Sequence, residues 1–412
     1  MLENVKRFDM KRPPQRQKLR WLIHLLAKPA LKKHNAKLRK VNMEGIKAPY
    51  LLLVNHNAFL DFKIVAEAIR PARQNFIVAI DGFIKREGLL RMVGGICKRK
   101  FTRDINVVYQ FKKVIENGDI AVMYPEARYS LCGTTAVLPD SLGKLAKLFK
   151  VPVVVMITKG HHINSPFWNL HDNNIQGIEA TMTCICDGEE IKTIPVDELN
   201  RRIREAFVYD DFAWQRDNKI ENTYEKRAEG LEKVLYQCPA CGTEYEMHTK
   251  DNHILCSHCH KEWEMSIYGE LHALDGKEIF THIPDWYEWE RENVRKEVKN
   301  GTYHFESEVH IDALPNAKGY IPMGKGTLIH DMNGFKVIFK DQNNEELFIP
   351  REEQYSCHIE YNYLGKYGDC VDLNTLDDTF YIYPECEKFS VTKLALATEE
   401  LYQDYFDNKR QL

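Results

Sequence analysis

Short apolar runs alternate with amphipathic segments between residues 48 and about 188. The runs have the length of buried β-strands, and the segments between them carry apolar residues at helical spacing. The predicted strands are 50–54, 76–80, 120–124, 151–158 and 180–186, and the predicted helices are 61–69, 104–116 and 139–150. Strands separated by helices indicate an α/β domain with a mostly parallel sheet flanked by helices. Two charged helical patterns, 196–207 and 219–236, close this domain, which we place at residues 48–235.

The pattern changes beyond residue 300, where strand-like runs follow one another without helices between them. Turn signals separate these runs, as at Asn333-Gly334. The predicted strands are 303–311, 325–330, 335–340, 346–349, 355–363, 370–374 and 379–383, and a helix is predicted at 388–406. This order of elements resembles a pleckstrin-homology-like (PH) or GRAM-like module. We therefore predict a β-rich C-terminal domain at residues 271–412.

His56 follows the first predicted strand, and Asp61 follows His56 at the start of the next helical pattern. On one continuous helix, residues at this spacing differ by about 140° around the axis and do not face each other. They meet if the strand ends at His56 and the helix begins just before Asp61. Both then lie at the carboxyl end of a parallel strand, where open α/β sheets bind ligands. A carboxylate on one ring nitrogen leaves the other as a general base; the alternative is a solvent-facing histidine beside a helix N-terminal aspartate.

Glu126 and Arg128 follow another predicted strand, which Pro125 ends. They too are expected at the carboxyl edge of the sheet. Arg128 has the geometry to bind a phosphate bidentately. Glu126 could accept a hydrogen bond from a hydroxyl group or brace its loop. The alternative is a surface ion pair in a turn.

A basic segment lies between these two motifs. It begins with Gly94-Gly95 and carries the cations Lys98, Arg99, Lys100 and Arg103 before a predicted helix capped by Asp104. Such a loop can cradle a phosphate. The alternative is a loop whose charges are simply solvated.

These segments resemble the lysophosphatidate-acyltransferase family (PlsC-like, 1-acylglycerol-3-phosphate O-acyltransferases). That family carries a His-x4-Asp block, a Gly-rich block ending in Arg, a Phe-Pro-Glu-Gly-Thr-Arg-Ser block and a Val-Pro strand. This chain offers 56–61, 95–99, 124–130 and 151–153 in the same order, over roughly residues 45–210. The third block departs from the family, because it reads Tyr-Pro-Glu-Ala-Arg-Tyr-Ser, with alanine in place of glycine and arginine one position early.

The resemblance implies an O-acyltransferase that moves a fatty acyl group from a thioester to the hydroxyl of lysophosphatidate or a related lysolipid. It makes His56 the general base and Asp61 its orienting partner. The substrate-binding residues would be Arg99, Lys100, Arg103, Glu126 and Arg128, with Arg99 the nearest match to the second block. The acyl donor would be acyl-CoA or an acyl-carrier protein. The alternative function is a catalytically inactive lipid- or protein-binding adaptor with the same fold.

Four cysteines form two C-x2-C pairs, Cys238/Cys241 and Cys256/Cys259. Each pair can point two thiolates at one ion, and two pairs complete a tetrahedron. We therefore predict a zinc ribbon at residues 236–270 that binds structural Zn²⁺, with iron as the minor alternative. The module has acidic surroundings, which argue against a nucleic-acid partner.

The first 47 residues are rich in Lys and Arg, opposed only by Glu3, Asp9 and Glu44, although the whole chain has a net charge of -3. Segment 18–40 mixes leucines and Trp21 with cations, which is typical of an amphipathic helix on an anionic membrane surface. The alternatives are a helix that caps the core or an arm that docks an acyl carrier protein. Apolar runs are too short to span a bilayer, and no signal peptide is evident. We therefore expect a cytoplasmic protein, peripheral on the cytoplasmic face of the membrane.

Overall fold

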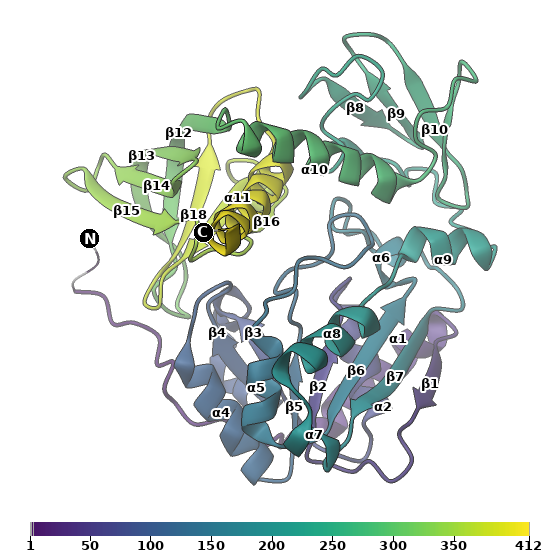
Figure 1. Ribbon diagram of the computed structural model, residues 1–412, viewed down its shortest axis with the longest axis vertical. Coiled ribbons are helices and arrows are strands. Elements are labelled where there is room, and N and C mark those ends of the chain that lie inside the picture. The colour runs from purple at the N-terminus through teal and green to yellow at the C-terminus, as the bar shows by residue number, and fades with distance from the viewer. Residues whose placement is uncertain (1, 3, 412) are drawn as a thin grey trace.

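The computed structural model describes residue 2 and residues 4–411. Three sheets organise the chain: a mixed sheet with helices on both faces, a small antiparallel sheet and a larger antiparallel sheet. In Figure 1 the mixed sheet lies at the bottom, the small sheet at the upper right and the larger antiparallel sheet at the upper left.

The mixed sheet has the strand order β1-β7-β6-β2-β5-β3-β4. Strands β6, β2, β5, β3 and β4 run parallel, whereas β7 pairs antiparallel with β6 and parallel with β1. This confirms the prediction of a mostly parallel sheet flanked by helices. The strands are β1 (Lys37–Val41), β2 (Leu51–Val54), β3 (Gln74–Ala79), β4 (Gly95–Lys98), β5 (Ile120–Met123), β6 (Val153–Lys159) and β7 (Glu179–Cys186).

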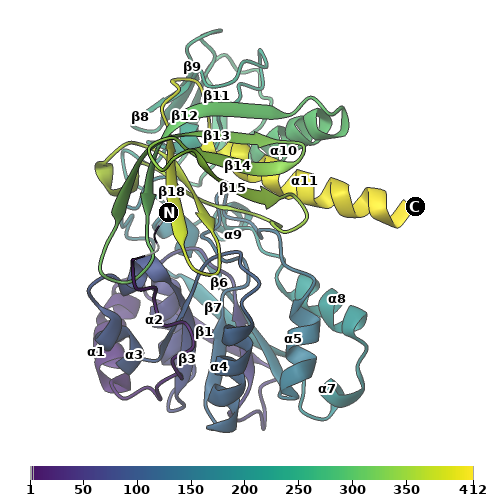
Figure 2. The ribbon, with the colours of Figure 1, turned by 90° about the vertical axis from the view of Figure 1, so that its left-hand side faces the viewer.

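Helices cover both faces of this sheet, with α1, α2 and α3 on one side and α4, α5 and α8 on the other (Figure 2). Strand β2 is buried at every position, as expected for a central strand. Its side chains alternate: Leu52 and Val54 join the core beneath α1 and α2, and Leu51 and Leu53 join the core beneath α4, α5 and α8. The helices are α1 (Arg20–Lys33), α2 (Leu60–Ala68), α3 (Glu87–Met92), α4 (Ile105–Glu116), α5 (Leu142–Phe149), α6 (His161–Asn164), α7 (Glu190–Thr193), α8 (Val196–Ala206) and α9 (Asp211–Asp217).

The helix predicted at 219–236 is wrong, because this segment folds as turns with only a 3₁₀ helix at Leu231–Lys233. Gly230 interrupts the helical pattern with a φ of 92°, and a Cβ there would lie 2.5 Å from the carbonyl oxygen of Trp168. The apolar residues that suggested a helix, such as Leu235, are instead buried in the core.

The predicted helical N-terminal arm at 1–47 also differs from the structure. Among the described residues of this arm only α1 is helical, and Lys37–Val41, with its three cations, forms the edge strand β1. The segment before α1 contacts the C-terminal domain, since Phe8 N donates to Pro315 O at 3.0 Å. No helix within the described residues is long and apolar enough to cross a membrane.

The cysteine-rich segment folds as the small sheet, in the order β11-β10-β9-β8. Its strands are β8 (Met247–Lys250), β9 (His253–Cys256), β10 (Glu262–Met265) and β11 (Leu271–Ala273). Helix α10 (Ile283–Lys299), which was not predicted from the sequence, supports this sheet through the ring contact of Trp286 with Trp263 at 5.0 Å.

The larger antiparallel sheet has the order β15-β14-β13-β12-β18-β17-β16; helix α11 packs against its strand β16, and α10 packs against α11. Its predicted strands and C-terminal helix are present. The bounds are β12 (His304–Ala313), β13 (Ile321–Asp331), β14 (Gly334–Phe339), β15 (Glu345–Pro350), β16 (His358–Glu360), β17 (Cys370–Asn374), β18 (Thr379–Pro384) and α11 (Val391–Gln411).

Candidate active site

His56 lies just beyond the carboxyl end of β2, and its main chain is fastened to segment 124–130. His56 N donates to Glu126 Oε2 at 2.7 Å, and Ser130 N donates to His56 O at 2.8 Å. Its ring contacts Tyr124 and Tyr129, with centroid distances of 4.3 and 4.4 Å. A quarter of the His56 side chain, 25%, is exposed. The imidazole is therefore held on several sides while one part of it remains open.

Asp61 occupies the first turn of α2 and faces His56, as the sequence predicted. Asp61 Oδ2 lies 3.3 Å from His56 Nδ1 and accepts hydrogen bonds from Asn57 N at 2.6 Å and Ala58 N at 3.0 Å. Burial by itself would raise the pKa of this carboxyl, but hydrogen bonds from His161 and His56 outweigh burial and hold the pKa well below its ordinary value. Asp61 is therefore ionised, and it orients the His56 ring by accepting from Nδ1.

His161 is a second histidine on the same carboxylate, and the sequence interpretation missed it. His161 Nδ1 lies 2.6 Å from Asp61 Oδ1, which also accepts from Thr158 Oγ1 at 3.1 Å. His161 is fully buried, and its Nε2 has no partner among the described residues. His161 lies 100 positions from Asp61 in the sequence, so no local sequence pattern could predict the contact.

Glu126 lies beneath the loop and does not line the cavity. Besides His56 N, it accepts from Ala136 N at 2.8 Å and Tyr209 OH at 3.3 Å. Burial raises the pKa of Glu126 to about 7 despite these hydrogen bonds. Of the two predicted roles, contact with a hydroxyl group or bracing of the loop, the geometry matches bracing.

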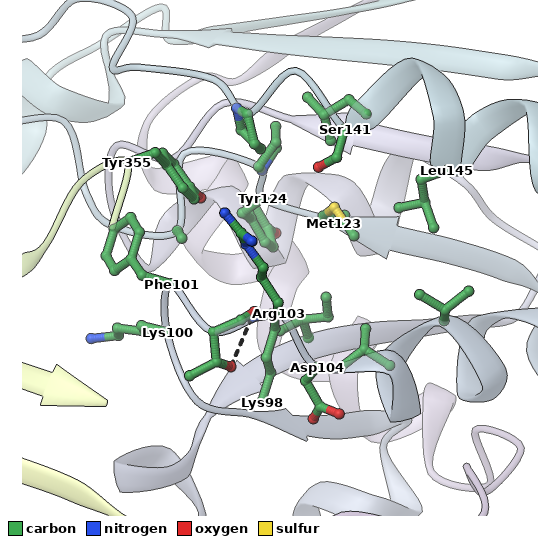
Figure 3. Close-up of a pocket in the computed structure, with 18 of the residues that line it drawn as sticks. Lys98, Lys100, Phe101, Arg103, Asp104, Met123, Tyr124, Ser141, Leu145 and Tyr355 are labelled. Carbon is green, nitrogen blue, oxygen red and sulfur yellow. Dashed lines mark hydrogen bonds between the residues drawn. The ribbon is translucent and has the colours of Figure 1, made fainter. Parts of the chain in front are cut away.

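A cavity of about 710 Å³ opens beside His56, between α4 and α5 (Figure 3). Apolar side chains from two strands and two helices form most of its wall: Ile77, Met123, Ile105, Val107, Val108, Leu142, Leu145 and Leu148. The C-terminal domain closes part of the cavity with Glu353, Tyr355 and Tyr402. The site thus combines one histidine with a largely apolar wall.

Three of the predicted cations, Lys98, Lys100 and Arg103, line this cavity. Burial lowers the pKa of Lys98 to about 8, and its Nζ donates to Thr102 O at 2.8 Å. Lys100 Nζ lies 2.8 Å from His358 Nε2 in the C-terminal domain. Arg103 is exposed, and its Nη2 donates to Glu352 O at 3.1 Å. Lys144, which the sequence interpretation did not single out, is a further exposed cation on the wall.

Arg99 and Arg128 do not line the cavity, contrary to expectation. Arg99 is 1% exposed and donates to Leu314 O at 2.9 Å and to Asp377 O at 2.6 Å, both in the C-terminal domain. Arg128 pairs with Glu399 of α11 at 2.6 Å. The glycine-containing start of the predicted phosphate cradle is not a loop, because Gly95–Lys98 forms strand β4 at the edge of the sheet. This segment pairs with β3 in parallel register.

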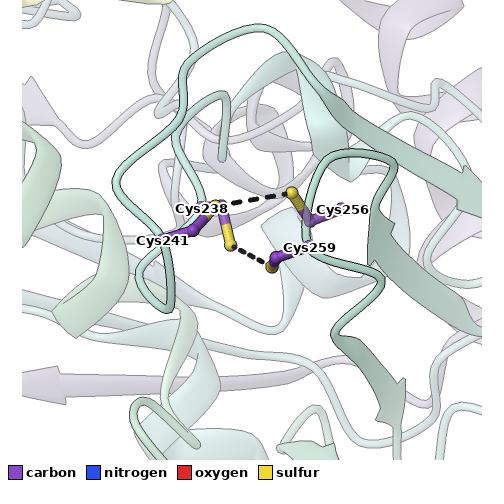
Figure 4. A group of neighbouring side chains, drawn as sticks. All are labelled: Cys238, Cys241, Cys256 and Cys259. Carbon is purple, nitrogen blue, oxygen red and sulfur yellow. Dashed lines mark hydrogen bonds between the residues drawn. The ribbon is translucent and has the colours of Figure 1, made fainter.

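The four predicted cysteine ligands converge in the small sheet (Figure 4). Their sulfur atoms all lie within 4.8 Å of one another, with Cys238 and Cys259 at 3.7 Å and Cys241 and Cys256 at 3.8 Å. Thiolates at about 2.3 Å from a tetrahedral zinc ion stand about 3.8 Å apart, so the donor set fits that ion. These four cysteines can therefore bind one metal ion such as zinc.

Comparison with known proteins gives little beyond this geometry. No protein-family model matches the chain, and no curated protein matches it. Among solved structures, the chain is similar to the 1-acyl-sn-glycerophosphate (LPA) acyltransferase PlsC from Thermotoga maritima, at 15% sequence identity and a TM-score of 0.37. The similarity covers 46% of this chain and 76% of that chain. At this level of similarity, inferences about function rest on the site itself.

Proposed function

We propose that this chain is an O-acyltransferase that moves a fatty acyl group from a thioester to a hydroxyl group of lysophosphatidate or a related lysolipid. The observation that carries the proposal is the His56–Asp61 pair at an apolar cavity whose wall also holds cations. His56 takes the proton from the acceptor hydroxyl, and the oxygen attacks the thioester carbonyl carbon. The C–S bond then breaks, and the imidazolium returns the proton to the leaving thiolate as the thiol is released.

The wall of the cavity supports a lipid substrate. A run of aliphatic side chains between α4 and α5 can bury an acyl chain, which gains about 0.8 kcal/mol for each CH₂ removed from water. Arg103 and Lys144 are exposed on the same wall and could pair with a phosphate group. We assign the phosphate to these two cations rather than to Arg99 or Arg128.

The outer face of α1 supports contact with an anionic membrane surface. Trp21, Leu25 and Leu26 are 61, 61 and 62% exposed there. Lys28 and Lys32 are exposed on the same helix. Large apolar side chains beside cations suit the boundary between headgroups and acyl chains. The acceptor lipid would be drawn from that surface.

The cysteine module is proposed to hold structural Zn²⁺. Four thiolates fill a tetrahedral site and leave no open position for a substrate. Gln237, which directly precedes Cys238, accepts a hydrogen bond from Trp286 Nε1 of α10 at 2.9 Å. A metal ion bound at Cys238 would therefore stabilise the segment that contacts α10.

An inactive lipid- or protein-binding adaptor is the second candidate. It is favoured by one observation: Arg99 and Arg128, which the family resemblance assigns to substrate, are both bonded to the C-terminal domain. An adaptor would keep the apolar cavity and lack turnover.

Acyl transfer from radiolabelled acyl-CoA or acyl-carrier protein to a panel of lysolipids tests the proposal. His56→Ala should lower kcat by about 10²–10⁴-fold, the usual contribution of a general base. His304→Ala, at a histidine that is 55% exposed on the C-terminal sheet, is the matched control and should behave as wild type. Wild-type turnover no faster than that of His56→Ala, together with retained lipid binding, would establish the adaptor instead.

A further inference from the structure

Segment 124–130 holds the general base in place. It supplies Glu126 to His56 N and Ser130 N to His56 O, so both main-chain polar groups of His56 are bonded to this segment. The segment turns sharply at Ala127, which has a φ of 57°. An alanine in this left-handed region is disfavoured by about 1–2 kcal/mol, so contacts outside the turn must hold it.

Arg128 provides such a contact. Within the described residues its side chain makes one hydrogen bond, from Nη2 to Glu399 Oε1 at 2.6 Å, while its Nε and Nη1 are buried without an acceptor. The two side chains are 3% and 1% exposed. They are 271 positions apart in the sequence, so this bond ties the catalytic segment to the C-terminal helix α11.

Glu399 is itself fixed from the other side. Ser356 Oγ donates to Glu399 Oε1 at 2.7 Å, and Arg291 Nη1 of α10 donates to Oε2 at 2.7 Å. Burial by itself would raise the pKa of this carboxyl, but the charges of Arg128 and Arg291 outweigh burial and lower the pKa. Glu399 is therefore an ionised carboxylate that accepts hydrogen bonds from three side chains.

We propose that Glu399 is a positioning residue for His56 and acts through Arg128 and segment 124–130. The inference rests on the proposed acyltransferase function and deepens it, because it makes the C-terminal domain part of the catalytic apparatus. Tyr355 and Tyr402 of the same domain line the cavity, which is consistent with that role. The alternative is that the bond between Glu399 and Arg128 only joins the two domains and has no effect on the rate of acyl transfer.

The test compares Glu399→Gln with Asp404→Asn. Asp404 lies on the same helix, and its carboxylate pairs with Arg351 at 3.2 Å rather than with Arg128. Glu399→Gln should lower kcat about tenfold or more while KM for the acyl donor changes less than twofold, because small displacements of a catalytic group cost rate. Asp404→Asn should leave both constants within twofold of wild type.

A second readout does not depend on turnover: the rate at which diethyl pyrocarbonate modifies His56, measured by mass spectrometry. This rate should change severalfold in Glu399→Gln and not in Asp404→Asn. If wild type transfers no acyl group, the proposed function fails, and the modification rates still decide whether Glu399 positions His56. Equal kcat and equal modification rates in the two variants would overturn the inference.

Glu399→Gln could fail to fold, which a thermal melt would reveal. Ser356→Ala then replaces it, because it removes one donor to Glu399 and keeps every charge. It should lower kcat severalfold at unchanged KM. A Ser356→Ala enzyme with wild-type kcat and an unchanged rate of His56 modification would overturn the inference in that case.

Discussion

Asp61→Asn is the most revealing single change, because the carboxylate is the acceptor in all five of its hydrogen bonds, and an asparagine side chain has only one acceptor oxygen. At Oδ2 they include two main-chain N–H groups, which cannot reverse. An asparagine must therefore place its oxygen at that end and its NH₂ toward His161 and Thr158. His161 could accept from the amide only by carrying its proton on Nε2, which is buried and has no partner among the described residues.

The expected loss of rate follows from the lost charge. At the 3.3 Å between His56 Nδ1 and Asp61 Oδ2, two unit charges attract by about 5 kcal/mol at an effective dielectric constant of 20. This sets the order of magnitude of what the carboxylate contributes to the imidazolium formed during proton transfer. The variant should therefore lose most of the contribution of the base, about 10²–10⁴-fold in kcat.

Stability should fall as well, by about 1–3 kcal/mol at neutral pH, for a buried donor left unsatisfied. The pKa of Asp61 is lowered by folding, so its stabilising effect is fully present above the unfolded value near 4 and is lost as the pH falls below that value. The difference in unfolding free energy between wild type and Asp61→Asn should thus shrink in acid. Urea unfolding at several pH values measures it.

Asp211→Asn is the matched control. Asp211 is also a fully buried carboxyl in the first turn of a helix, but it accepts from His162 N and burial raises its pKa to about 7. This substitution should leave kcat within a few fold of the wild-type value. Above pH 7 it should not lower the free energy of unfolding as Asp61→Asn does at neutral pH. Equal losses of rate in both variants, or wild-type turnover in Asp61→Asn, would refute the role of Asp61 as orienting partner.

Three further outcomes are expected. Burial raises the pKa of Glu126 from 4.5 to about 7. Wild type should therefore lose about 3 kcal/mol of stability relative to Glu126→Gln as the pH rises through this window, and urea unfolding that gives a constant difference would contradict this. Elemental analysis should find about one zinc per chain, and chelation or Cys238→Ser should lower Tm, whereas a chain without metal would rule out the ribbon. Leu25→Glu should weaken sedimentation with vesicles containing phosphatidate about tenfold to a hundredfold, and Leu170→Glu, at a leucine 68% exposed elsewhere, should not; equal binding would remove α1 from the membrane contact.

Much of the α/β layer could be predicted from the sequence because its signals are local. The strand before His56 and the helix containing Asp61 form one strand–helix unit, so the spacing of the two residues already determined that they could meet. The same holds for the cysteines, whose two pairs each lie within one turn and need only one further approach to form a tetrahedral set. Local geometry was sufficient in both cases.

Composition could not decide where the arginines point. Arg99 and Arg128 have the charge that a phosphate site needs, but the C-terminal domain supplies their acceptors, and those lie 215–280 positions away in the sequence. Helix α10 was not predicted, although Pro284 in its first turn is a helix start signal. The sequence by itself determined which residues could do chemistry, because spacing and chemical type are local properties. Only the tertiary structure decided which of them face the cavity, because a buried charge must find its partner wherever the fold brings one.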